Sequence, residues 1–183
     1  FGVADVSGKG IKSSLLMSKA SSLYRCLSKT IFSAAELLNI LNDEICETAS
    51  RGMFVTMVIG IYDSNKKELL ISNAGHEPPL IFSKGENFSN LEEAGPPLGI
   101  APKFKFTEKL VSFKESSMYI FTDGITEMKD TKGEMLGQEG FQNYIKKYQS
   151  TSNSQRLGKI IEDLIKSGRI QKDDLTIVAI DGV

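Results

Sequence analysis

The sequence predicts an α+β fold built on antiparallel strands, and two observations lead to that prediction. First, runs rich in β-branched and aromatic residues follow one another across a short turn in residues 53–73, as the strands of a hairpin do. Second, helical periodicity is grouped in residues 11–45 and 141–165 instead of following every strand. This grouping favours an antiparallel layered fold over a doubly wound parallel sheet.

The N-terminal region is predicted to hold a strand end and a helical hairpin. Residues 1–4 have strand character, and residues 5–10 form a polar turn whose glycines take positive φ. Ser33 and Glu36 have the spacing of a capping box, which opens the second helix. Helical spacing of apolar residues runs from Ile11 to about Ser28 (Leu15, Leu16, Met17, Ala20, Leu23, Leu27) and then from Leu37 to Ile45 (with Leu38 and Leu41).

The remainder of the chain is predicted to be mainly strands, with two further helices. Met53–Tyr62 and Glu68–Asn73 form a hairpin across the turn Asp63–Lys66. The later elements are a strand at 79–82, a polar loop at 84–90, a turn-prone segment at 95–99 in which Pro96 and Pro97 are structural, strands at 104–110 and 118–121, helices at 141–148 and 157–165, and a strand at 175–180.

Composition indicates a soluble, cytoplasmic globular chain. Its 183 residues suit one domain, 1–183, with 40% hydrophobic and 25% charged residues. The 22 basic and 23 acidic residues give a formal charge of −1, which leaves no electrostatic footprint for nucleic acid and no polybasic surface for membrane contact. No apolar run approaches the roughly 18 residues of a membrane span, and no signal peptide is recognisable.

Two further features concern the cysteines and the chain start. Cys26 and Cys46 lie within apolar helical patterns, so we expect buried, reduced thiols. The chain begins at Phe1 inside a strand, without an initiator Met, which indicates a piece of a longer protein.

Four acids carry the main functional signal. Asp5, Asp123, Asp173 and Asp174 each stand near the end or beginning of a short apolar run of strand character. One acid at a strand end is commonly a turn residue, but several brought to one sheet edge repel each other unless a cation intervenes. Oxygen ligands without a Cys or His cluster favour Mg²⁺ or Mn²⁺, so the sequence predicts metal-assisted hydrolysis.

The chain resembles a known family over almost its whole length. Six motifs in the family's order carry the resemblance: residues 5–10 (DVSGKG), 54–56 (FVT), 73–79 (NAGHEPP), 95–99 (GPPLG), 122–127 (TDGITE) and 173–176 (DDLT). They are similar to the SpoIIE-like, RsbU-like bacterial branch of the PPM (type 2C) metal-dependent serine/threonine phosphatases. The resemblance implies a four-layer α-β-β-α sandwich of two antiparallel sheets flanked by helices, with its N-terminal edge missing here.

The resemblance also assigns residue roles. Two Mn²⁺ or Mg²⁺ ions are expected, with Asp5 bridging them, the Val6 carbonyl as a further ligand, and Asp123 and Asp173 completing the protein shell. Asp174 is given a supporting role. Two cations bridged by a carboxylate lower the pKa of shared water and align an in-line attack on phosphorus.

Expected partners follow from the same family. The substrate implied is a phosphorylated STAS-domain anti-anti-sigma protein. A sensor or receiver domain is expected N-terminal to this region, and the two N-terminal helices are either simply core or a homodimer surface.

Several residues keep two interpretations. The family usually has another acidic motif upstream of Asp5, which this chain does not contain, so a non-catalytic pseudophosphatase is the alternative function; a metal-dependent nuclease ranks below both because a basic surface is lacking. Ser7 occupies the position where animal-type relatives have a His that can protonate the leaving group. His76 either takes that task or braces a loop.

The glycine turn and the residues around Asp123 are also open. Lys9 is either solvated or near substrate phosphate, while Gly8 and Gly10 shape the turn. Thr122, Gly124 and Glu127 shape the turn around Asp123, and Glu127 either supports the site or is a surface residue.

Overall fold

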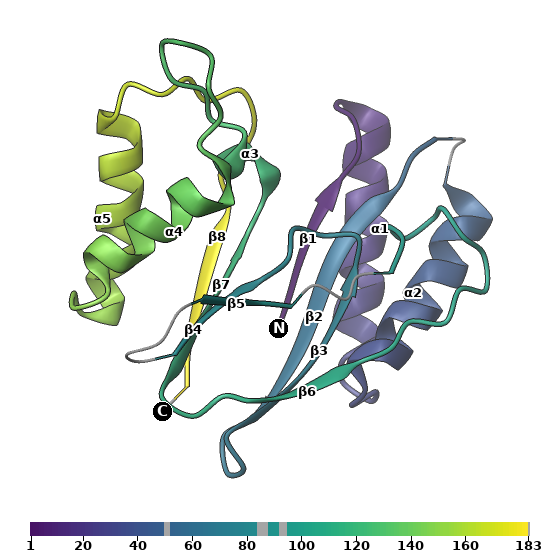
Figure 1. The fold of residues 1–183 in the computed structure, drawn as a ribbon. Coiled ribbons are helices and arrows are strands. Elements are labelled where there is room, and N and C mark those ends of the chain that lie inside the picture. The colour runs from purple at the N-terminus through teal and green to yellow at the C-terminus, as the bar shows by residue number, and fades with distance from the viewer. Residues whose placement is uncertain (50–51, 84–87, 92–94, 183) are drawn as a thin grey trace. The chain divides into compact units, whose positions relative to one another are not determined.

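The computed structural model describes residues 1–49, 52–83, 88–91 and 95–182. They form two compact units: unit 1 contains residues 1–78, 91–115 and 182–183, and unit 2 contains residues 79–90 and 116–181. The elements are β1 (Gly2–Val6), α1 (Ile11–Leu27), α2 (Ala34–Thr48), β2 (Val55–Asp63), β3 (Glu68–Ala74), β4 (Leu80–Ser83), β5 (Phe88–Asn90), β6 (Lys109–Ser112), β7 (Ser116–Phe121), α3 (Asp123–Thr126), α4 (Gly137–Tyr148), α5 (Asn153–Lys166) and β8 (Ile177–Asp181) (Figure 1).

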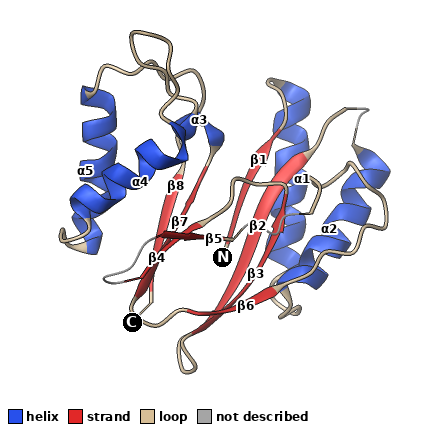
Figure 2. Ribbon diagram, viewed as in Figure 1, coloured by secondary structure: helices blue, strands red, loops and turns tan. Residues whose placement is uncertain are grey.

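Unit 1 is an antiparallel sheet covered by the predicted helical hairpin. The strand order is β1-β2-β3-β6, and α1 and α2 lie on one face of the sheet (Figure 2). Ser33 Oγ accepts a hydrogen bond from the Glu36 N–H at 3.1 Å, which confirms the predicted N-cap of α2. The apolar face of α2 is buried as predicted (Leu37, Leu38, Leu41, Ile45).

Helix α1 is less buried than the sequence suggested. Leu16 and Ala20 face the core, but Leu15 is 66% exposed and Cys26 is also exposed. Each residue turns the helix by about 100°, so Leu15 lies a step around from Leu16 and leaves the buried stripe. The predicted burial of Cys26 is therefore wrong. Cys46 is half-buried beside Asn42, and both cysteines are free thiols, as expected.

Unit 2 is a second antiparallel sheet packed against α4 and α5. The strand order is β5-β4-β7-β8, and the two helices lie on one face of it (Figure 2). Phe121 of β7 meets Phe141 of α4 edge-on, with ring centroids 4.8 Å apart. Ile145 and Ile160 complete this core and are fully buried. The predicted α+β class with two antiparallel sheets and flanking helices is confirmed.

Two strand predictions need correction. Phe88–Asn90 of the predicted polar loop forms β5, because Phe88 pairs with Phe82 of β4 with ring centroids 5.0 Å apart; residues 84–87 lie outside the described residues. The predicted strand at 104–110 starts only at Lys109. Its first half bonds to side chains instead: the Phe106 N–H donates to Asn39 Oδ1 at 2.8 Å, and Ser72 Oγ donates to the Thr107 carbonyl at 2.6 Å.

Other boundaries shift by a few residues. Helices α4 and α5 begin four residues before the predicted starts, and the predicted turn at Asp123 is a single-turn helix, α3. The last strand begins at Ile177 instead of Leu175. Among the helices of the described ranges, none is long and apolar enough to cross a membrane.

Candidate metal centre

Asp5 is held at the end of β1 in unit 1. It pairs with Thr56 of β2 in the antiparallel register, and its side chain is half-buried. The Val6 N–H donates to Asp5 Oδ1 at 3.0 Å. Thr56 Oγ1 donates to the Asp5 carbonyl at 3.4 Å and lies 2.9 Å from His76 Nδ1. Pairing with β2 and the bond from Thr56 therefore fix the backbone of Asp5.

His76 braces the loop that follows β3. It is 4% exposed, its N–H donates to Asn73 Oδ1 at 2.8 Å, and Asn73 Nδ2 donates to the His76 carbonyl at 3.0 Å. Gly75 has φ +68, and a Cβ there would come within 2.6 Å of Pro97. Of the two interpretations of His76, the structure supports the bracing one.

The turn after Asp5 is closed by Ser7. The Ser7 N–H donates to the Phe54 carbonyl at 2.9 Å, and the Phe54 N–H donates to Ser7 Oγ at 2.8 Å. Gly8 and Gly10 have φ of +78 and +92, which confirms the predicted left-handed glycines. Ser7 thus serves the turn, and Lys9 is exposed.

Asp123 is the first residue of α3 in unit 2. The preceding strand β7 is largely buried, whereas Asp123, two residues beyond the end of that strand, is exposed. Its carbonyl accepts from the Glu127 N–H at 2.8 Å and from Thr126 Oγ1 at 3.1 Å. These bonds close the single helical turn and involve the backbone carbonyl of Asp123, not its carboxylate.

The loop carrying Asp173 and Asp174 is fastened next to Asp123. Thr122 Oγ1 donates to the Asp174 carbonyl and accepts from the Thr176 N–H, both at 3.1 Å. A Cβ on Gly124 would lie 2.3 Å from the Asp174 carbonyl oxygen. Only glycine allows this approach, which brings the start of α3 against the loop that carries Asp173 and Asp174, called the acid loop below.

The predicted ligands thus fall into two groups. Asp123, Asp173 and Asp174 belong to unit 2, where the Asp174 carbonyl approaches Gly124, while Asp5 and Val6 belong to unit 1. Within the part of the chain that is described, no group of three or more His, Cys, Asp and Glu residues is close enough to hold a metal ion. A shared ion between Asp5 and the unit 2 acids stays a prediction. The exposed carboxylates of unit 2 fit Mg²⁺ or Mn²⁺ by their oxygen chemistry.

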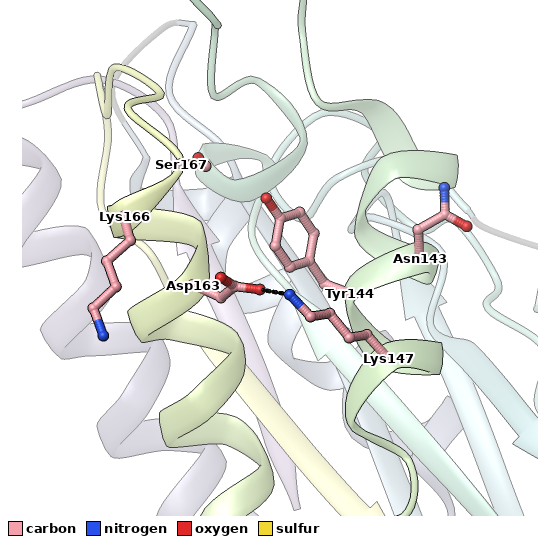
Figure 3. Close-up of a pocket in the computed structure, with 6 residues that line it drawn as sticks. All are labelled: Asn143, Tyr144, Lys147, Asp163, Lys166 and Ser167. Carbon is pink, nitrogen blue, oxygen red and sulfur yellow. Dashed lines mark hydrogen bonds and ion pairs between the residues drawn. The ribbon is translucent and has the colours of Figure 1, made fainter.

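A pocket lies between α4 and α5 of unit 2, and its lining residues differ from the predicted site residues. Its volume is about 320 Å³, and it is lined by Asn143, Tyr144, Lys147, Asp163, Lys166 and Ser167 (Figure 3). Lys147 and Asp163 point toward each other and form an ion pair at 2.6 Å. The hydrogen bond from Lys147 lowers the pKa of Asp163. Asp163, which supplies the one carboxylate among the six lining residues, is therefore already paired. None of the predicted site residues lines the pocket.

Sequence reasoning missed Arg169 and Gln171, which contact the acid loop and the turn after α3. Gln171 Nε2 donates to the Asp173 carbonyl at 3.0 Å, and Arg169 Nη1 donates to the carbonyls of Met128 and Glu134. Both lie just after α5 in a segment with no periodic pattern. Their partners are backbone carbonyls up to 41 residues away, which leave no signal in side-chain type.

Comparison with known proteins settles the family. The profile of the Stage II sporulation protein E (SpoIIE) family matches residues 1–182. The chain belongs to the SpoIIE family. The predicted assignment to the SpoIIE-like, RsbU-like branch of the PPM phosphatases is thereby confirmed. The phosphoserine phosphatase RsbU of Bacillus subtilis (strain 168) is 29% identical over 181 residues, which cover 97% of this chain and 54% of RsbU. This SpoIIE-family chain thus spans about half the length of that relative.

Solved structures show the same fold. The SiaA-PP2C domain of Pseudomonas aeruginosa matches with a TM-score of 0.84 at 18% identity, covering 98% of this chain and 73% of that one. RsbX in complex with magnesium matches with a TM-score of 0.71 at 17% identity, covering 97% and 78% respectively. At these identities the likeness concerns the fold, which is that of the PP2C phosphatases.

Proposed function

We propose that this SpoIIE-family chain is a metal-dependent protein serine/threonine phosphatase acting on a phosphorylated STAS-type anti-anti-sigma regulator. The observation that carries the proposal is the fastening of Asp173 and Asp174 against the start of α3, where Asp123 stands. Asp123, Asp173 and Asp174 are all exposed acids, and Asp173 Oδ1 also accepts a hydrogen bond from the Asp174 N–H at 2.9 Å, which orients its carboxylate. Membership of a family whose relatives include a phosphoserine phosphatase supports the same function.

The proposed centre holds two Mn²⁺ or Mg²⁺ ions. Asp5, the Val6 carbonyl, Asp123 and Asp173 are the proposed ligands, and Asp174 supports them. When bound, such ions lower the pKa of water and neutralise phosphoryl oxygens. The chain's own contribution is orientation: Thr122 and Gly124 set the spacing between Asp123 and Asp173, and the β1–β2 pairing fixes Asp5. Magnesium in the complex of RsbX, which has a similar fold, supports a divalent ion.

The proposed partners follow the family. A phosphorylated STAS protein is the substrate, a sensor or receiver domain supplies the input, and the α1–α2 pair provides a homodimer surface. Exposure of Ile11 and Leu15 on α1, at 80% and 66%, supports an interaction on this face.

One observation favours the alternative of a non-catalytic pseudophosphatase. Ser7 Oγ accepts from the Phe54 N–H at 2.8 Å, and His76 is buried in its bracing role. Both residues serve the fold around Asp5, which makes a partner-binding module without hydrolysis the second candidate.

The test is Mn²⁺-dependent release of phosphate from a phosphoserine STAS protein. The 183-residue chain and the complete gene product should be compared with their Asp123→Asn variants, and Glu139→Gln, an exposed acid of α4, is the control. Release by the wild type that falls at least about 100-fold in Asp123→Asn and persists in Glu139→Gln is the expected result. Retention of phosphate by all versions despite substrate binding would favour the pseudophosphatase.

A further inference from the structure

Arg169 lies at the point where the acid loop leaves α5. It follows Gly168, which has φ +73 and ends the helical segment, and its side chain is half-buried. Arg169 Nη1 donates to the Met128 carbonyl at 3.3 Å and to the Glu134 carbonyl at 3.1 Å. One guanidinium nitrogen thus binds both ends of the turn that follows α3.

This turn is a rigid acceptor. The Leu136 N–H donates to the Met128 carbonyl at 2.8 Å, and the Asp130 N–H donates to the Glu134 carbonyl at 3.0 Å. Asp130 Oδ1 accepts from the N–H groups of Lys132 and Glu134. Met128 is 1% exposed and belongs to the core of unit 2. Arg169 is therefore attached to a turn that is closed by its own hydrogen bonds and anchored at the buried Met128, although residues 131–135 are exposed.

The neighbouring backbone adds to this attachment. The Ile170 N–H donates to the Lys129 carbonyl at 2.8 Å, and the Lys129 N–H donates to the Ile170 carbonyl at 3.4 Å. The segment beyond Ile170 is fixed again at Asp174 and Thr176, where Thr122 Oγ1 donates to the Asp174 carbonyl and accepts from the Thr176 N–H. Asp173 is exposed between these two attachments, with its own carbonyl bound by Gln171.

We infer that Arg169 is a positioning residue: by binding the Met128 and Glu134 carbonyls, it fixes the first attachment of the loop that presents Asp173. This inference rests on the proposed function, because Asp173 is a proposed ligand of the divalent ion. Arg169 acts through the backbone and does not touch substrate or ion. Arginine suits the task because the two N–H groups of Nη1 are held in the fixed guanidinium plane, one for each carbonyl, whereas the donors of a lysine ammonium rotate on a flexible stem.

The first measurement is hydrogen exchange of residues 170–176 without added metal. Loss of two charge-assisted bonds in Arg169→Gln should speed exchange in this segment by on the order of tenfold. Arg169→Lys should give an intermediate rate. Lys172→Gln removes a positive charge from the same loop without touching Met128 or Glu134, and it should exchange like the wild type.

The second measurement is Mn²⁺ affinity by calorimetry, well below the unfolding temperature of each variant. Affinity should fall on the order of tenfold in Arg169→Gln, less in Arg169→Lys, and stay unchanged in Lys172→Gln. A merely structural role would lower the unfolding temperature without changing either exchange within the loop or affinity of the folded protein. A rise in KM for the phosphoprotein with unchanged Mn²⁺ affinity would overturn the inference in favour of substrate binding.

Failure of the two proposals can be told apart. If the wild type neither binds Mn²⁺ nor releases phosphate, the proposed function fails, while the exchange comparison still decides whether Arg169 fixes the loop. If the wild type is active and Arg169→Gln leaves exchange at 170–176 unchanged, the positioning role is wrong and the phosphatase proposal stands.

Discussion

Thr122 and Gly124 flank Asp123 and control its surroundings by opposite means. Thr122 supplies a hydroxyl that bonds both to the Asp174 carbonyl and to the Thr176 N–H. Gly124 supplies the absence of a side chain, so that the Asp174 carbonyl can approach α3. Thr122 binds the acid loop through hydrogen bonds, and Gly124 leaves space for the backbone of that loop. The spacing between Asp123 and Asp173 therefore depends on residues that are not ligands.

The first prediction concerns Gly124→Ala. The new Cβ would lie 2.3 Å from the Asp174 carbonyl oxygen and 3.2 Å from its carbon, and a backbone group cannot rotate away as a side chain can. We expect a loss of about 1–3 kcal/mol in the free energy of unfolding, measured by urea denaturation, together with weaker Mn²⁺ binding.

Gly158→Ala is the matched control for that substitution. Gly158 is exposed within α5, and no atom lies within 4 Å of its ideal Cβ position. Alanine should stabilise the helix by about 1 kcal/mol and leave Mn²⁺ binding unchanged. Equal unfolding free energies and Mn²⁺ affinities for Gly124→Ala and the wild type would show that the loop can move away at no cost.

At the residue scale, the sequence predicted positions at strand ends and turns better than contacts. Asp5 and Asp123 were recognisable because acids end apolar strand runs, and Gly8 and Gly10 because a polar turn needs positive φ. The two hydrogen bonds of Thr122 could not be predicted, because their partners lie 52 and 54 residues away and are backbone atoms. A hydroxyl that bonds to distant backbone looks in sequence like any surface threonine.

At the scale of elements, helices α4 and α5 are joined by a polar contact on top of their apolar packing. Lys147 Nζ donates to Asp163 Oδ2 at 2.6 Å, and Tyr148 Oη donates to the same oxygen at 3.0 Å. The hydrogen bond from Lys147, followed by that from Tyr148, lowers the pKa of Asp163, and the bond to Asp163 raises the pKa of Lys147. The contact joins the two helices only while both groups are charged.

The second prediction is the pH dependence of this contact. Because the pKa of Asp163 is lowered by folding, its contribution to stability is present above the unfolded value of about 3.9 and is lost as pH falls through the folded pKa. The raised pKa of Lys147 keeps its contribution intact below about pH 10.4. Lys147→Met should therefore be less stable than the wild type at pH 7, and this difference should shrink below pH 4.

Urea denaturation at pH 7 and at pH 3 measures this difference. Lys159→Met is the control, since Lys159 is an exposed lysine of α5 and does not contribute to the lowered pKa of Asp163. Its effect should be no more than a few tenths of a kcal/mol. A stability difference for Lys147→Met that is as large at pH 3 as at pH 7 would assign the effect to packing of the lysine stem instead of the ion pair.

Periodic elements could be predicted and irregular ones could not. The apolar stripe and capping pattern of α2 gave its start correctly, because both signals are local. The strand predicted at 104–110 was misplaced because Asn39 and Ser72, both distant in sequence, bind the backbone there. Cys26 was misjudged because α1 has a narrow buried stripe that apolar composition alone does not reveal.

At the scale of the whole molecule, the class and order of the elements followed from the sequence, since hairpin spacing and grouped helices determine an antiparallel layered fold. The division into two units did not, because unit 1 takes residues 91–115 from beyond the first strand of unit 2. That return of the chain separates the proposed ligands, with Asp5 in one unit and Asp123 and Asp173 in the other.

The last prediction uses this division. Under our proposal, acids of both units bind the same ions, so Mn²⁺ should stabilise the folded chain and should need both sets of ligands to do so. At a free Mn²⁺ concentration 100 times the dissociation constant, the free energy of unfolding should rise by about 2.7 kcal/mol. Asp5→Asn, Asp123→Asn and Asp173→Asn should each lose most of this increase, whereas Glu139→Gln should keep it.

Thermal unfolding with and without Mn²⁺ distinguishes the arrangements, because a ligand stabilises only the states that bind it. If Asp5→Asn keeps the full stabilisation while Asp123→Asn loses it, the ion is bound by unit 2 alone and Asp5 is not a bridging ligand. Loss in all three variants requires that unfolding of either unit releases the ion. In that case Mn²⁺ couples the stability of the two units, and a signal that shifts Asp5 changes ion occupancy at Asp123.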